Sequence, residues 1–137
     1  MKEKPEINIL VVDDEIEIQH LFRKLLSRNG CRVRTTGSGE KALEMVKKQA
    51  FDVIFLDVRL PGFSGHQTLR GIRGIRPDTR LIMMSGLPIE QRVRGVFCEE
   101  SQGFIYKPFK IREIMDLAKR NRTYPGSKRQ DEIANYR

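Results

Sequence analysis

The sequence of 137 residues predicts an α/β fold, a doubly wound sheet of five parallel strands with five helices on its two faces. Three observations lead to this fold class. Short apolar segments alternate with longer amphipathic ones, one apolar segment is continuously hydrophobic, and polar side chains follow where the apolar segments end. Parallel neighbouring strands need crossover connections, and the amphipathic segments can supply them as helices.

The expected strands are short and rich in β-branched or other apolar residues. The third one, FDVIFLD, has an unbroken apolar run, which indicates burial on both faces. The second alternates as a half-buried strand does. In order, the five strands are expected at 7–12, 31–35, 51–57, 80–85 and 103–106.

The expected helices differ in the strength of their signals. Ser38 is placed to cap the second helix, Gly71 and Gly74 weaken the third, and Pro88 begins a short fourth one. The first helix carries Ile18, Leu21, Phe22, Leu25 and Leu26 at helical spacing, and Asn29 and Gly30 close it. The helices are expected at 15–30, after Ser38, at 66–75, 88–98 and 109–120.

Composition restricts the class of protein. The chain is 39% hydrophobic and 32% charged, typical of a soluble globular domain, and no apolar run approaches the ~20 residues that span a bilayer. The charged start, MKEKPE, is unlike a signal peptide, so we expect a cytoplasmic protein without membrane contact. Cys31 and Cys98 lack the spacing of a zinc site or a disulfide framework.

The net charge of +8 is concentrated after residue 69. Such a bias could favour nucleic acid, anionic lipid or an acidic protein partner. Because no groove-reading motif accompanies it, solvated helix faces and loop ends explain the charge better, and we do not expect direct nucleic-acid binding by this segment.

Polar residues follow four of the five strands. Sites in doubly wound sheets form at the carboxyl ends of the strands, so these residues should meet at one edge. Three carboxylates there would repel one another, by about 4 kcal/mol per pair at ~4 Å and an effective dielectric of about 20, unless a cation neutralises their charge. Mg²⁺ and a lysine suit this need, and a carboxylate so placed can attack phosphorus. The residues are Asp13, Asp14, Asp57, Ser85 and Lys107.

Four motifs in this order and spacing, ILVVDDE, FLDVRLPGFSG, MMSG and YKPF, closely resemble the receiver domain of two-component response regulators. The resemblance implies the CheY-like, flavodoxin-like three-layer fold over 6–121. Residues 122–137 lack clear periodicity and are expected to be a basic tail or the beginning of a linker.

The resemblance assigns Asp57 as the phosphoacceptor, which takes a phosphoryl group from a histidine of a sensor kinase or phosphotransfer protein. It assigns Asp13, Asp14 and Asp57, with the backbone carbonyl of Arg59, as the ligands of Mg²⁺. Lys107 matches the lysine that pairs with the phosphoacceptor and then with the phosphoryl oxygens.

The resemblance also implies a switch. Ser85 matches the hydroxyl that bonds to the new phosphoryl group, and Phe104 matches the aromatic residue that swings inward with it. Pro108 resembles a cis-peptide proline beside the lysine, and Gly86 leaves room for phosphodonors. The signalling face would run from the fourth to the fifth helix, and basic residues there would select an acidic partner, an output domain or a second copy of the chain. These basic residues are Arg92, Arg94, Lys110 and Arg112.

Each residue has an ordinary structural interpretation when taken alone. An aspartate caps helices or turns, Lys107 is a surface lysine, Phe104 a core aromatic and Ser85 a turn residue. Together, however, these interpretations do not explain why all of them meet at one edge of the sheet. His20 and His66 lack a partner in the sequence, and we expect both at the surface.

Several positions depart from the family pattern. Ser64 stands where receivers carry Asp or Asn before Gly65, and Arg59 and Leu87 occupy positions through which the family adjusts self-dephosphorylation. The segment CEESQG replaces small residues before the last strand. The lifetime of the phosphoryl group and the end of the fourth helix therefore stay open.

Three function classes remain. The first is a phosphoryl-switch module, a regulator that catalyses only its own phosphorylation and dephosphorylation. The second is a Mg²⁺-dependent phosphohydrolase, against which Arg59 stands two residues after Asp57 where an acid/base aspartate is needed. The third is a degenerate receiver, or a part of a DNA-binding regulator, that acts through its basic surface; it lacks a recognisable helix-turn-helix after residue 120.

Overall fold

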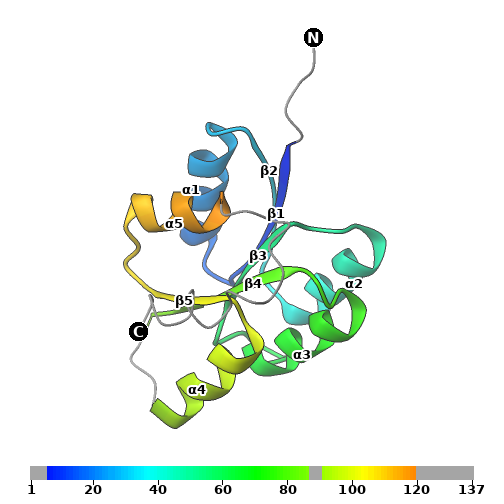
Figure 1. The fold of residues 1–137 in the computed structure, drawn as a ribbon. Helices are drawn as coiled ribbons and strands as arrows, with labels where there is room; N and C mark the ends of the chain where they lie inside the picture. Colours follow the sequence, from blue (N-terminus) through cyan, green and yellow to red (C-terminus); the bar gives the residue numbers. More distant parts are fainter. Residues whose placement is uncertain (1–5, 87–90, 120–137) are drawn as a thin grey trace.

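The computed structural model describes residues 6–86 and 91–119, in which strands and helices alternate. The five parallel strands form one sheet in the order β2-β1-β3-β4-β5 (Figure 1). The predicted doubly wound α/β fold is thereby confirmed. The elements are β1 (Ile7–Val12), α1 (Ile16–Ser27), β2 (Cys31–Thr36), α2 (Gly39–Lys48), β3 (Val53–Asp57), α3 (Gly65–Ile75), β4 (Arg80–Ser85), α4 (Gln91–Glu100), β5 (Gly103–Tyr106) and α5 (Ile111–Ala118).

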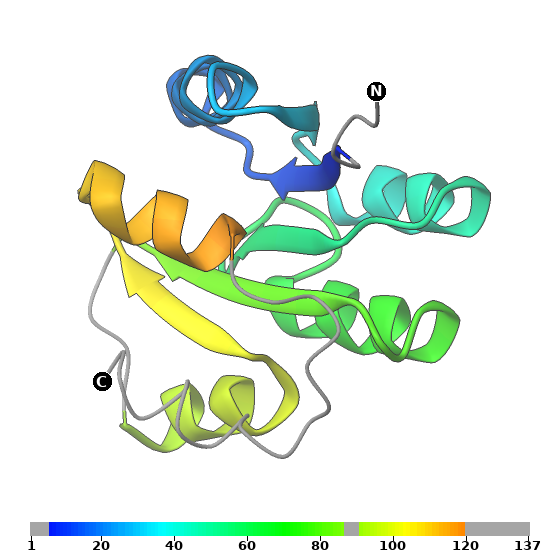
Figure 2. The same ribbon diagram turned by 45° about the horizontal axis from the view of Figure 1, so that its top comes forward.

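The sheet is the middle of three layers. Helices α1 and α5 cover one face, and α2, α3 and α4 cover the other (Figures 1 and 2). Alternate residues of β1 enter the two resulting cores: Ile9 and Val11 join the first, Leu10 and Val12 the second. Every residue of β3 is buried, as the continuous apolar run predicts.

The helix boundaries follow local signals where caps are present. The side chain of Ser38 accepts the N–H of Lys41 at 3.0 Å, which confirms the predicted cap of α2. Ser64 and Gln67 form a capping box that begins α3. Gly71 lies inside α3, which continues through it. A Cβ at Gly71 would lie 2.7 Å from the side chain of Leu43, so the glycine allows α2 and α3 to approach closely.

The buried stripe of α1 is centred on Phe22 and Leu26, and Leu21 at its margin is 39% exposed. One expectation needs correction. The fourth helix was expected to end at residue 98, but α4 continues to Glu100. The reason is tertiary: Arg73 of α3 donates from Nε to the carbonyl of Glu100 at 3.1 Å and so satisfies the last turn.

Some predictions fall outside the described residues. They concern the helix start at Pro88, the side chains of Leu87 and Arg92, and the tail 122–137. Within 6–86 and 91–119, no helix combines the length and the apolar composition that crossing a bilayer requires.

Candidate functional site

Strand register brings the predicted polar residues to one edge of the sheet. Val12 of β1 pairs with Leu56 of β3, so Asp13 and Asp57 follow at adjacent strand ends. Ser85 ends β4 opposite Tyr106 of β5. The N–H of Lys107, the residue after β5, donates to the carbonyl of Ser85 at 2.8 Å. The carboxyl ends of β1, β3, β4 and β5 therefore build one site.

Asp57 is a buried carboxylate in a fixed orientation, 5% exposed. Its Oδ1 accepts the backbone N–H of Arg59 at 2.9 Å, and its Oδ2 lies 3.1 Å from Nζ of Lys107. The turn after Asp57 depends on Gly65, because a Cβ at this residue would lie 2.5 Å from the carbonyl oxygen of Val58. A glycine that permits this backbone approach therefore holds the loop that carries the carboxylate.

Asp13 is fully buried and contacts the same lysine. Its Oδ1 accepts the N–H of Glu15 at 2.8 Å, and Gln19 Nε2 donates to its carbonyl at 2.7 Å. Burial raises the pKa of the Asp13 carboxyl to about 6, and repulsion from Asp57 adds to that rise, although Lys107 and the Glu15 N–H oppose it. The ionised carboxylate is therefore costly here.

Lys107 is the cation that the carboxylates share. Its Nζ lies 2.6 Å from Glu15 Oε1, 2.9 Å from Asp13 Oδ2 and 3.1 Å from Asp57 Oδ2. Burial by itself lowers the pKa of this lysine, but hydrogen bonds to the three acidic side chains outweigh burial and raise the pKa above its ordinary value. Lys107 is therefore protonated at neutral pH. The Lys107–Pro108 peptide is cis, as the resemblance implies.

The acidic residues fit a divalent cation. Ligand atoms of Asp13, Asp14 and Asp57 lie within 4.8 Å of one another. Oδ2 of Asp13 is buried, and among the described residues its partner is the ammonium of Lys107, 2.9 Å away. Glu15 adds a fourth acidic side chain at this edge of the sheet, and Lys107 contacts three of the four, namely Asp13, Glu15 and Asp57. Mg²⁺ would reduce this excess of negative charge through the oxygen ligands that it prefers.

The two predicted switch residues lie beside this site and are both buried. Ser85 is 2% exposed at the end of β4, and Phe104 is 1% exposed on β5. The Phe104 ring packs 6.4 Å from Phe97 and 5.2 Å from Tyr106, centroid to centroid. The guanidinium carbon of Arg94 lies 5.4 Å from the Phe104 centroid and 5.7 Å from that of Tyr106. Arg94 is thus a ring-stacking residue rather than the solvated charge expected from the sequence.

Two contacts were missed by sequence reasoning. Glu15, the nearest partner of Lys107, stands directly after the two aspartates, and that position was the available signal. His66 was expected at the surface without partners, but it is half-buried. Its ring meets Phe97 edge-on at 5.7 Å, and its Nε2 lies 3.6 Å from Glu100 Oε1. No local pattern indicates contacts between α3 and α4.

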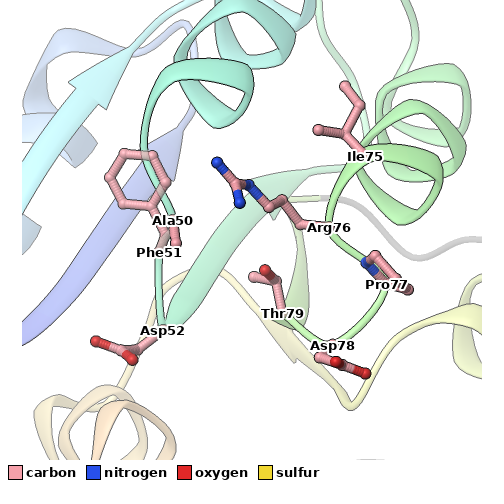
Figure 3. Close-up of a pocket in the computed structure, with 8 residues that line it drawn as sticks. All are labelled: Ala50, Phe51, Asp52, Ile75, Arg76, Pro77, Asp78 and Thr79. Atoms are coloured by element: carbon pink, nitrogen blue, oxygen red, sulfur yellow. The ribbon is translucent and has the colours of Figure 1, made fainter.

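A hollow of about 350 Å³ lies at the opposite edge of the sheet, where β3 and β4 begin (Figure 3). Arg76 extends across it toward the connection between α2 and β3. It is distinct from the site around Asp57, because the two occupy opposite ends of the same strands. The lining residues are Ala50, Phe51, Asp52, Ile75, Arg76, Pro77, Asp78 and Thr79.

Comparisons with known proteins agree with this geometry. The family model described as "Response regulator receiver domain" matches residues 9–119. The chain is 30% identical over 110 residues to the probable transcriptional regulatory protein TcrX of Mycobacterium tuberculosis, which covers 80% of this chain and 47% of that protein. It is 30% identical over 109 residues to the regulatory protein VanRB of Enterococcus faecalis, covering 80% of this chain and 49% of the relative. The chain thus spans about half the length of these curated relatives.

Solved structures give the same result. The receiver domain of NtrX from Brucella abortus superposes with a TM-score of 0.75 at 32% identity, covering 82% of this chain and 95% of that one. A CheY-like receiver domain protein from Methanospirillum hungatei has a TM-score of 0.80 at 21% identity, covering 93% and 99%, and supports the fold alone.

Proposed function

Because the chain belongs to the response regulator receiver domain family, we propose that it accepts a phosphoryl group on Asp57 in a Mg²⁺-dependent reaction. The observation that carries the proposal is the buried, oriented Asp57 carboxylate with a protonated lysine 3.1 Å away and two further aspartates beside it. A structural carboxylate would not need this surplus of acidic neighbours, which costs stability.

The reaction is a transfer between two nucleophiles. A carboxylate oxygen of Asp57 forms a bond to phosphorus while the bond between phosphorus and the donor's imidazole nitrogen breaks, and the electron pair of that bond stays on the nitrogen. Mg²⁺, when held by Asp13, Asp14, Asp57 and the Arg59 carbonyl, supplies charge neutralisation for the phosphoryl oxygens. Lys107 offers its ammonium to the same oxygens, and the Arg59 N–H keeps the acceptor carboxylate oriented.

The consequence of phosphorylation would be a change of surface. Ser85 follows Met84, the register partner of Asp57, and we expect its hydroxyl to bond to the phosphoryl group. Phe104 lies on the next strand with its ring against Tyr106 and Arg94. A shift of this ring would therefore change the exposed surface that α4, β5 and α5 form. Lys110 and Arg112 make that face basic and suit an acidic partner.

We propose a sensor histidine kinase or phosphotransfer protein as the phosphodonor. The relatives TcrX and VanRB are named as regulatory proteins, TcrX as a probable transcriptional one, and both are about twice as long as the matched segment. An output domain, an acidic protein or a second copy of the chain would then read the switched surface. We take 6–121 as the domain, and we do not expect it to bind nucleic acid directly, because no groove-reading motif accompanies its basic charge.

Intact-protein mass spectrometry after incubation with acetyl phosphate and Mg²⁺ tests the proposal. We expect one phosphoryl group on the wild type, none on Asp57→Asn and none in EDTA. Asp52→Asn is the matched control, because it makes the same chemical change at the other end of β3 and should be phosphorylated like the wild type. Phosphorylation of Asp57→Asn, or an unmodified wild type under conditions that modify a control receiver, would contradict the proposal.

A further inference from the structure

Glu15 makes the shortest of the three acidic contacts of Lys107, at 2.6 Å between Oε1 and Nζ. It differs from the other two partners in its position. The side chain of Glu15 is 58% exposed, whereas those of Asp13 and Asp57 are 0% and 7% exposed. Glu15 therefore holds the lysine from the solvent side, and the two aspartates hold it from the interior.

The backbone of Glu15 is fixed while its side chain is available. Glu15 is the N-cap residue of α1, and its carbonyl accepts the N–H groups of Ile18 and Gln19. Its own N–H donates to Asp13 Oδ1. The side chain makes no capping hydrogen bond and instead reaches Lys107, 92 positions later in the sequence. Glutamate is not among the preferred N-cap residues, and the longer Glu15 side chain extends past the start of α1 to the lysine.

The oxygens of the two inner carboxylates explain why an outer partner matters. In each of them, one oxygen accepts a backbone N–H, from Glu15 to Asp13 and from Arg59 to Asp57. The other oxygen of each faces Nζ of Lys107. A cation that binds Asp13 and Asp57 therefore meets the lysine ammonium on both of them, and the two positive charges repel each other.

We propose that Glu15 is a positioning residue for Lys107. Its carboxylate retains the ammonium on the α1 side of the site while a divalent cation binds the carboxylate oxygens of Asp13 and Asp57 that otherwise face the lysine. The lysine then stays within reach of an anion on Asp57 without competing for the metal ligands. This inference rests on the proposed function and adds a role for a residue outside the predicted site.

Removal of the Glu15 charge should move the lysine inward. In Glu15→Gln the ammonium loses its outer carboxylate and is left with Asp13 and Asp57, where it competes with Mg²⁺. We expect the Mg²⁺ concentration for half-saturation to rise about tenfold.

Two NMR readouts test the proposal in the full chain. The first is the side-chain ammonium signal of Lys107 in EDTA, identified by its loss in Lys107→Ala, and the second is a Mg²⁺ titration followed on backbone amides. Glu17→Gln is the matched control, because Glu17 is an exposed acidic residue in the first turn of the same helix. Glu15→Asp keeps the charge but shortens the reach.

We expect Glu15→Gln to shift the Lys107 signal and to weaken Mg²⁺ binding, Glu17→Gln to change the half-saturation by less than about twofold, and Glu15→Asp to lie between Glu15→Gln and the wild type. Equal effects of Glu15→Gln and Glu17→Gln, or an unmoved Lys107 signal, would overturn the proposal in favour of long-range charge. So would wild-type behaviour of Glu15→Asp.

The outcome is separable from that of the proposed function, because neither NMR readout requires phosphorylation. If the expected shifts appear but Asp57 is never phosphorylated, the proposed function fails and the role of Glu15 stands. If the wild type is phosphorylated and Glu15→Gln binds Mg²⁺ as the wild type does, the proposed function stands and the role of Glu15 fails. A wild type that binds no Mg²⁺ would overturn both.

Discussion

The two ends of the sheet carry similar charged residues, but these residues have different partners. At the amino end, Asp52 precedes β3, and its Oδ2 accepts the N–H of Asn8 at 2.7 Å. Arg76 crosses the hollow there and donates from Nε to the carbonyl of Val46 at 2.8 Å (Figure 3). At the carboxyl end, Asp13 and Asp57 also accept backbone N–H groups, but their remaining oxygens face a single shared lysine.

The difference lies in what satisfies the charge. At the amino end, side chains are matched to backbone groups whose positions the fold already fixes, so the polar atoms stabilise the fold. At the carboxyl end, several carboxylates share one ammonium, and their oxygens fit a further cation. An acidic residue at a strand end is therefore a functional candidate when its neighbours are other carboxylates.

The largest expected effect is a loss of stability at the carboxyl end of the sheet that depends on Mg²⁺. Lys107→Met leaves Asp13 and Asp57 without their common cation, so the metal-free protein should lose about 3 kcal/mol of unfolding free energy. Mg²⁺ should restore part of this loss, because it supplies the missing positive charge. Urea unfolding followed by circular dichroism in EDTA and in Mg²⁺ measures both effects. An equal loss under the two conditions would contradict the shared-cation interpretation.

Asp13→Asn should sharpen the comparison through pH. The pKa of Asp13 rises from 3.8 to about 6 on folding, so the folded protein holds this proton more tightly than the unfolded chain does. The corresponding stability is complete below about pH 4 and is lost as the pH rises through about 6. In EDTA, Asp13→Asn should match the wild type near the lower limit and exceed it by about 2 kcal/mol at neutral pH.

Urea unfolding of the wild type and Asp13→Asn at a series of pH values checks this prediction. The informative quantity is the difference between the two proteins, since other carboxylates titrate in both. A difference that stays constant across the series would show that burial of Asp13 does not carry the proton linkage.

The smallest effect belongs to the amino end. Asp52→Ala removes the acceptor of the Asn8 N–H and should lower the unfolding free energy by about 1.5 kcal/mol. The loss should be the same in EDTA and in Mg²⁺, and phosphorylation by acetyl phosphate should be unchanged. If Asp52→Ala also changed the Mg²⁺ concentration for half-saturation, the two ends of the sheet would not be independent and the prediction would be wrong.

Much of the fold follows from local patterns in the sequence. The unbroken apolar run of β3, the half-buried alternation of β2 and the Ser38 cap each depend on neighbours a few positions away. Parallel strands also place all their carboxyl ends at one edge of the sheet, and Asp13, Asp57 and Lys107 meet there. The principal members of the site could be predicted because strand ends are visible in the sequence.

Other features were decided by the tertiary structure alone. The end of α4 depends on Arg73 from α3, and the surroundings of His66 depend on Phe97 and Glu100 from α4. The contact of Glu15 with Lys107 joins residues 92 positions apart. Such contacts depend on the reach of individual side chains and on how the helices pack, and no local periodicity carries that information. The sequence alone determined the strand ends that build the site, whereas packing decided which side chain would hold the lysine.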